Sequence, residues 1–142
     1  MVERGSSAQA LFCELVVRVG NATGKAVGKN QSVFEWEDAS LELVPVAWNN
    51  SNPAVLFVFT LTGFRVGSAA TLAQLLHLNR QLLHDCELPA CFCLDESGLH
   101  VQFQQRMRLD EMPLWALQRY VEDSLSRLRD LFVVVATPTT TG

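Results

Sequence analysis

The sequence predicts a single α+β domain with a twisted antiparallel sheet and three helices, in the element order α-βββ-α-ββ-α. Two patterns carry this prediction: in three segments apolar residues recur at helical spacing, and in five shorter segments they alternate with a period of two, as in strands. A length of 142 residues suits one domain that buries its own core without disulfides or metal. We expect this domain to span residues 7–132, between an N-terminal tail (1–6) and a flexible C-terminal tail (133–142).

The first helix is predicted over residues 7–19. Ser6 and Gln9 form a Ser-x-x-Gln capping box, and Gly20 ends the apolar repeat. The repeat consists of Ala8, Leu11, Phe12, Leu15, Val16 and Val19. The next stretch, GNATGKAVGKNQS, is rich in glycine and polar residues and is expected to be a flexible connection.

Three strands are predicted next. Phe34 and Trp36 share one face of the first strand, and a turn at 38–40 leads into a second strand in which Leu41 and Leu43 share a face. These two strands should form a hairpin. In the third, both alternating sets of residues are apolar, so we expect it to be central or covered on both sides.

The second helix should have Ser68 as its N-cap and end near Asp85. Its apolar stripe contains Ala69, Leu72, Leu75, Leu76, Asn79, Leu82 and Leu83. Two further strands follow, joined by the tight turn DESG at 95–98, where Gly98 is free to adopt a positive φ.

The last helix is expected to have Asp110 as its N-cap and to tolerate Pro113 in its first turn. One face should be apolar, formed by Leu114, Leu117, Val121, Leu125, Leu128 and Phe132. The tail VVVATPTTTG lacks helical signals and is expected to fray.

Composition and charge exclude several function classes. The net charge is -4 and the basic residues are scattered, so no basic stripe is available for nucleic acid. The longest apolar run, at 54–64, has about half of the ~20 residues that a membrane helix needs. The amphipathic N-terminus, with Glu3 and Glu14, is no Sec signal peptide, so we expect a bacterial cytoplasmic protein with reduced cysteines.

Three of the four cysteines lie close together in sequence, which raises the question of a metal or catalytic site. Cys86, Cys91 and Cys93 have the spacing C-x4-C-x-C, with His84 and His100 nearby, whereas structural zinc sites usually use C-x2-4-C. In a strand Cys91 and Cys93 would stand ~6.5 to 7 Å apart, awkward for one tetrahedral ion or a disulfide. We therefore interpret both as small apolar residues on the core side of a strand or at a partner interface.

No credible catalytic constellation is present. No histidine or cysteine has the surroundings of a known nucleophile, the paired carboxylates lie at turns, and no phosphate-binding loop follows a strand. We expect a protein that catalyses no reaction and binds no cofactor.

The segment from Leu75 to Phe132 resembles the class I chaperones of bacterial type III secretion, the Tir-chaperone-like superfamily. The matching features are Leu76 and Asn79 in a leucine-rich helix, the turn LDESG, the strand end RMRLD and a long final helix. The element order is also that family's order. The resemblance implies a homodimer that binds the N-terminal segment of a secreted effector and keeps it competent for export. A regulator that sequesters another secretion or transcription-control protein is the alternative.

Two candidate surfaces follow. The predicted partner-binding residues, on the first helix and first hairpin, are Leu11, Phe12, Leu15, Val19, Phe34 and Trp36. The predicted dimer interface, on the second helix, consists of Leu72, Leu75, Leu76, Asn79 and Leu83. Burial within one subunit is the competing use of both sets. An edge strand of the sheet could also accept an added strand from a partner.

Overall fold

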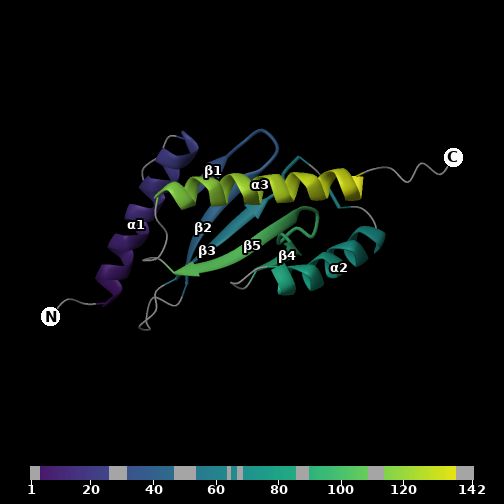
Figure 1. Ribbon diagram of the computed structural model, residues 1–142, viewed down its shortest axis with the longest axis horizontal. Helices are drawn as coiled ribbons and strands as arrows, with labels where there is room; N and C mark the ends of the chain where they lie inside the picture. The colour runs from purple at the N-terminus through teal and green to yellow at the C-terminus, as the bar shows by residue number, and fades with distance from the viewer. Residues whose placement is uncertain are drawn as a thin grey trace.

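The computed structural model describes residues 4–25, 32–46, 54–63, 65–66, 69–85, 90–108 and 114–136. It confirms the predicted fold, a single α+β domain of three helices and a five-stranded antiparallel sheet (Figure 1). In chain order the elements are α1 (Arg4–Thr23), β1 (Val33–Glu35), β2 (Ser40–Val46), β3 (Ala54–Thr60), α2 (Ala69–Asp85), β4 (Ala90–Leu94), β5 (Val101–Arg108) and α3 (Leu114–Ala136). The predicted N-caps Ser68 and Asp110, and Pro113, lie outside the described residues.

The sheet has the strand order β1-β2-β3-β5-β4, and all neighbouring strands are antiparallel. β3 is therefore central, as its two apolar faces predicted. One row of buried side chains crosses all five strands in register: Phe34, Leu41, Phe59, Phe103 and Phe92. In this row the ring centroid of Phe103 lies 6.2 Å from that of Phe59 and 5.4 Å from that of Phe92. The row forms the middle of the hydrophobic core.

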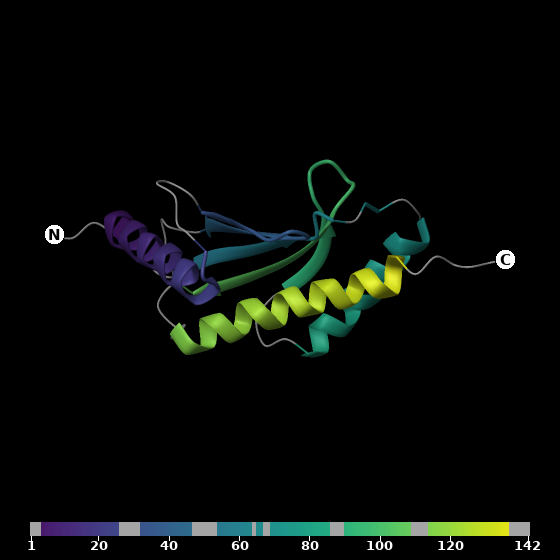
Figure 2. The ribbon, with the colours of Figure 1, turned by 90° about the horizontal axis from the view of Figure 1, so that it is seen from above.

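The helices cover one face of the sheet. α3 lies across that face, with α1 packed against α3 at one end and α2 beside β4 at the other (Figures 1 and 2). The opposite face carries no described helix, as Figure 2 shows. Because only one face is covered by helices, the side chains of the other face are the ones available to ligands or partners.

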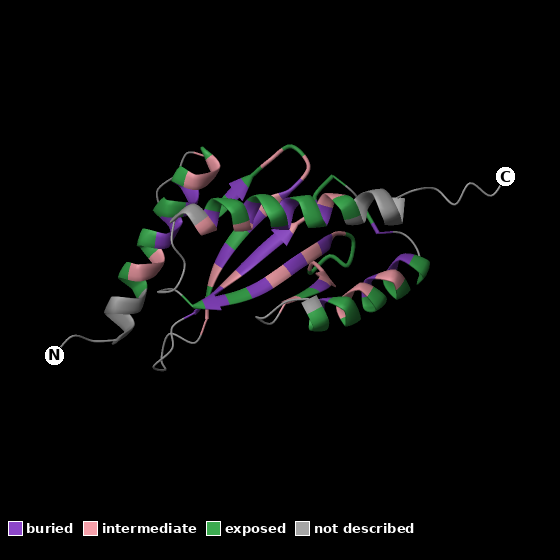
Figure 3. Ribbon diagram, in the orientation of Figure 1, coloured by how far each residue is buried: buried purple, intermediate pink, exposed green. Residues whose placement is uncertain are grey.

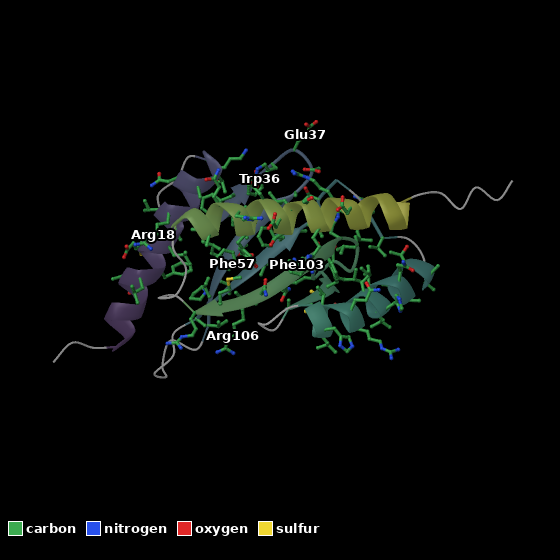
Figure 4. The ribbon with its side chains drawn as sticks, viewed as in Figure 1. Arg18, Trp36, Glu37, Phe57, Phe103 and Arg106 are labelled. Atoms are coloured by element: carbon green, nitrogen blue, oxygen red, sulfur yellow. The ribbon has the colours of Figure 1, made fainter. Side chains whose placement is uncertain are left out.

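Burial follows the same arrangement (Figure 3). α3 buries a stripe at helical spacing formed by Leu117, Val121, Leu125 and Leu128. Phe57 and Phe103 lie between the sheet and α3, where the ring of Phe57 meets that of Tyr120 edge to face at 5.1 Å, while Arg106 points away into solvent (Figure 4).

α1 is longer than its sequence pattern predicted. It begins at Arg4, so Ser6 lies within the helix and is not its N-cap. It also continues through Gly20, whose ~1 kcal/mol helix penalty is small beside the packing of the buried Val19 next to it. The helix ends at Gly24, which has a φ of 69°, and the Lys25 N–H donates to the Gly20 carbonyl at 3.0 Å.

α3 is also longer than predicted. It continues to Ala136, so residues 133–136, which were assigned to a flexible tail, are helical. The physical reason is that no glycine or proline interrupts the chain before Pro138, and valine is only a mildly unfavourable helix residue.

The predicted DESG turn is confirmed. Gly98 has a φ of 74°, and its N–H donates to the Asp95 carbonyl at 2.9 Å. The Asp95 carboxylate accepts hydrogen bonds from the Ser97 hydroxyl at 2.6 Å and from the backbone N–H groups of Leu99 and His100. These hydrogen bonds lower the pKa of Asp95, and the bond from Ser97 has the largest effect.

A bidentate ion pair joins the first hairpin to α3. Nε and one terminal nitrogen of Arg129 each donate to a different carboxylate oxygen of Asp38, both at 2.9 Å. The hydrogen bonds from Arg129 lower the pKa of Asp38. The Asp38 carbonyl also accepts from the N–H of Gly63 at 3.0 Å, so three segments distant in sequence meet at this aspartate.

Candidate protein-binding surfaces

The outward face of α2 is an exposed leucine stripe. Leu72, Leu76 and Leu83 are 41%, 72% and 80% exposed. At 3.6 residues per turn they fall within an arc of about 40° around the helix axis. On the inner side of the same helix Leu75 and Leu82 are both 4% exposed and belong to the core. α2 is therefore apolar on two sides, and only one of them is covered in the monomer.

Asn79 fastens α2 to the edge strand β4. Its side-chain NH2 donates to the Phe92 carbonyl at 2.8 Å, and its side-chain oxygen accepts from the Phe92 N–H at 2.5 Å. Phe92 pairs with Phe103 of β5 on the other side. Since an edge strand presents alternate N–H and C=O groups outward, Asn79 occupies both outward groups at the centre of β4. A strand cannot be added there without displacing this amide.

The predicted dimer interface is thus divided between two roles. Leu72, Leu76 and Leu83 are exposed, whereas Leu75 is buried and Asn79 is hydrogen-bonded within the subunit. The spacing of apolar residues could not separate the two sets, because both lie within one broad apolar arc.

The predicted partner-binding residues do not form an exposed groove. Leu15, Val19 and Phe34 are 5%, 0% and 2% exposed and are part of the core. The reason is that the apolar arc of α1 packs against α3 and joins the core formed with the sheet, so the chain itself covers these three side chains. Leu11, Phe12 and Trp36 are partly buried against the same core.

Val17, a large apolar residue of α1, is 50% exposed and lies on the same side of the helix as the exposed Cys13. By sequence these two residues widen the apolar arc of the helix. They are exposed because α1 turns the side with Leu15 and Val19 toward α3, which leaves the edge of the apolar arc uncovered.

The helix-free face of the sheet is partly apolar and partly polar. Val33, at 40% exposure, and the half-buried Leu56 contribute apolar surface. Beside them runs a chain of hydrogen bonds: Gln104 Nε2 donates to Gln102 Oε1 at 2.8 Å, and Gln102 Nε2 donates to Thr60 Oγ1 at 3.1 Å. Both glutamines lie on β5, and Thr60, which is opposite Gln102 in the ladder, extends the chain of bonds to β3.

Cys91 and Cys93 lie on this helix-free face. Of the two positions expected for them, the core side and a partner interface, the structure excludes the core side: Phe92 faces the core, while Cys91 is exposed and Cys93 is half-buried. In a strand with apolar residues on both sides, alternation alone does not say which set is inside. Burial raises the pKa of the Cys93 thiol to about 11, and the nearby Cys91 thiol is the second, smaller cause. Cys93 is therefore protonated at neutral pH and is a poor nucleophile.

Across the described part of the chain, no group of three or more His, Cys, Asp or Glu side chains is placed to hold a metal ion. No described helix combines the length and hydropathy needed to cross a membrane. Comparison with protein-family models and with curated proteins gave no match for this chain.

Proposed function

We propose that this protein is a non-enzymatic type III secretion chaperone, which binds the N-terminal region of a secreted effector as a homodimer in the bacterial cytoplasm. The sequence resemblance supports this through features that have a structural role here. The LDESG segment ends β4 and forms the turn with the positive φ of Gly98, and RMRLD overlaps the end of β5 at Arg108. The observed element order is the order expected of that family.

The observation that carries the proposal is the exposed leucine stripe of α2. The exposed fractions of Leu72, Leu76 and Leu83 together equal about two whole leucine side chains. Covering them is worth ~3 to 6 kcal/mol for each copy. Two copies therefore gain about 6 to 12 kcal/mol, which is comparable to the ~4 to 15 kcal/mol cost of association. Burial of the stripe therefore offsets most of the cost of association, and other contacts in the interface would supply the rest.

The stripe is also suited to pairing with itself. If two α2 helices cross about a twofold axis in antiparallel directions, Leu72 of one copy lies near Leu83 of the other. Leu76 is then closest to the axis and contacts its own counterpart. This arrangement makes Leu76 the residue whose replacement should weaken the dimer most.

For the effector, the available sheet edge is β1. The Ser32 carbonyl accepts from Leu43 N–H at 2.9 Å, and Trp36 N–H donates to the Ala39 carbonyl at 2.8 Å, so these groups point toward β2. By the alternation of an antiparallel ladder, the backbone groups of Val33 and Glu35 then point outward. Because Asn79 occupies the centre of the opposite edge at β4, an extended effector segment would add to β1.

The dimer is tested with the variant Leu76→Glu. Light scattering after size-exclusion chromatography should give twice the chain mass for the wild type and the single chain mass for Leu76→Glu. Gln81→Glu is the matched control, because it adds the same charge at an exposed position of the same helix outside the stripe. A monomeric wild type, or a Leu76→Glu variant that is still dimeric, would contradict the proposal.

The partner is tested by co-expression with proteins encoded beside the gene, followed by affinity purification. Capture of the N-terminal segment of a secreted protein supports the chaperone. Capture of a folded regulatory protein would instead support the alternative, a regulator that sequesters a secretion or transcription-control protein.

A further inference from the structure

Two thiols lie side by side on the uncovered face of β4. Cys91 and Cys93 are two residues apart in the same strand, so their side chains project from the same face. Cys91 is exposed, and the half-buried Cys93 thiol donates to Gln102 Oε1 at 3.8 Å. No described helix covers this face (Figure 2). The pair is therefore accessible to a small ligand.

The strand geometry selects what the pair can do. A disulfide needs Cβ atoms ~3.5 to 4.5 Å apart, but residues two apart in a strand have Cα atoms ~6.6 Å apart and nearly parallel side chains. A bridging ion with two metal–sulfur bonds of ~2.3 Å separates the sulfurs by up to about 4.6 Å. The strand fixes the two Cβ atoms too far apart for a disulfide, but rotation about χ1 can turn each sulfur toward the other by ~1 to 1.5 Å. The sulfurs can therefore approach the ~4.6 Å that one ion between them spans.

The number and type of ligands at Cys91 and Cys93 indicate which class of ion can bind. Zn²⁺ requires about four ligands and Ca²⁺ or Mg²⁺ require six or more oxygens, and the described residues offer no cluster of even three such ligands. Soft monovalent ions prefer thiolates and are satisfied by two of them. The nearby Gln102 and Gln104 side chains are neutral and bonded to each other, so they add no competing charge.

We propose that Cys91 and Cys93 form a two-thiolate site for one soft monovalent ion, of which Cu(I) is the biological example. On binding, each S–H bond breaks and its proton passes to solvent, while each sulfur forms one bond to copper. No electron is transferred, because the ion arrives as Cu(I). This proposal does not depend on the chaperone function.

The test is an anaerobic titration of the full chain with Cu(I) presented as its bicinchoninate complex, whose loss of colour reports transfer. We expect uptake of one Cu(I) per chain. Cys91→Ser and Cys93→Ser should each weaken binding by more than about tenfold. Serine keeps a hydroxyl that can donate to Gln102, so the strand contacts of Cys93 are retained. X-ray absorption should show two sulfur neighbours of copper.

Cys13→Ser and Cys86→Ser are the controls and should bind as the wild type does. Three results would overturn the proposal: loss of Cu(I) binding in either control variant, uptake of half an ion per chain, or no uptake of Cu(I) at all. A measurement without mutation guards against misfolded variants: Cu(I) should protect Cys91 from alkylation by iodoacetamide while the exposed Cys13 still reacts. Equal reactivity of Cys91 with and without copper would likewise overturn it.

Discussion

Replacing Asn79 by alanine should destabilise the protein and expose the edge of β4. The change removes two hydrogen bonds to the backbone of Phe92, at 2.8 and 2.5 Å. Each is worth ~0.5 to 1.5 kcal/mol. Because the site is only partly buried, water can replace part of the loss, and we expect a decrease of about 1 to 2 kcal/mol in the free energy of unfolding. For a chain of this size, that decrease lowers the melting temperature by ~3 to 7 °C.

Two assays check this expectation. Urea denaturation gives the change in free energy, and hydrogen exchange of the Phe92 amide reports the lost bond directly, with an expected acceleration of about tenfold or more. Asn79→Asp keeps an acceptor for the Phe92 N–H but loses the donor to its carbonyl, so it should lie between alanine and the wild type. Gln81→Ala, exposed on the same helix, should change stability by less than ~0.5 kcal/mol. An Asn79→Ala protein with wild-type stability and an equally protected Phe92 amide would refute the reasoning.

Three further outcomes are expected. Asp38→Asn should cost less than ~1 kcal/mol at pH 7, since the pair with Arg129 is 43% and 42% exposed. The pKa of Asp38 is lowered in the folded state, so the stability that its carboxylate contributes is present above the unfolded-state pKa and is lost as the pH falls below it. The urea midpoints of variant and wild type should therefore differ at pH 7 and converge at pH 3. An equal difference at both pH values would contradict this pH dependence. Gly98→Ala should cost about 1 to 2 kcal/mol in thermal denaturation because of its φ of 74°, with no contribution from a clash since nothing lies within 4 Å of an added Cβ. Leu15→Asp should unfold the protein, which circular dichroism would show, because the residue is 5% exposed; a folded variant would mean that α1 does not pack as described.

Sequence periodicity predicted the fold class and the order of the elements along the chain. Helical and strand periods identified all the described elements, and the apolar character of both faces of β3 placed that strand at the centre of the sheet. Helix ends were less accurate, since Gly20 is tolerated inside α1 and α3 continues beyond residue 132. Packing outweighs a single unfavourable residue, and no local pattern reports packing.

The candidate surfaces were harder to predict for a related reason. Apolar spacing shows which side of a helix avoids water, but not whether the chain itself or a partner covers it. On α1 the apolar arc around Leu15 is covered by α3, whereas on α2 two apolar sides exist and only the one with Leu75 is covered. For Cys91 the spacing was ambiguous because both faces of β4 carry apolar side chains. In each case the answer depends on contacts between residues distant in the sequence.

The position of β3 at the centre of the sheet has a consequence for synthesis on the ribosome. β3 pairs with β5, and the paired residues are far apart in sequence, as Phe57 with Gln105. At ~5 to 20 residues per second, about 2 to 10 s pass between the synthesis of the two strands. The hairpin of β1 and β2 can pair with β3 at once, but the other edge of β3 lacks its neighbour during this interval. The nascent chain therefore carries a strand with one unpaired edge and apolar side chains on both faces, which favours aggregation.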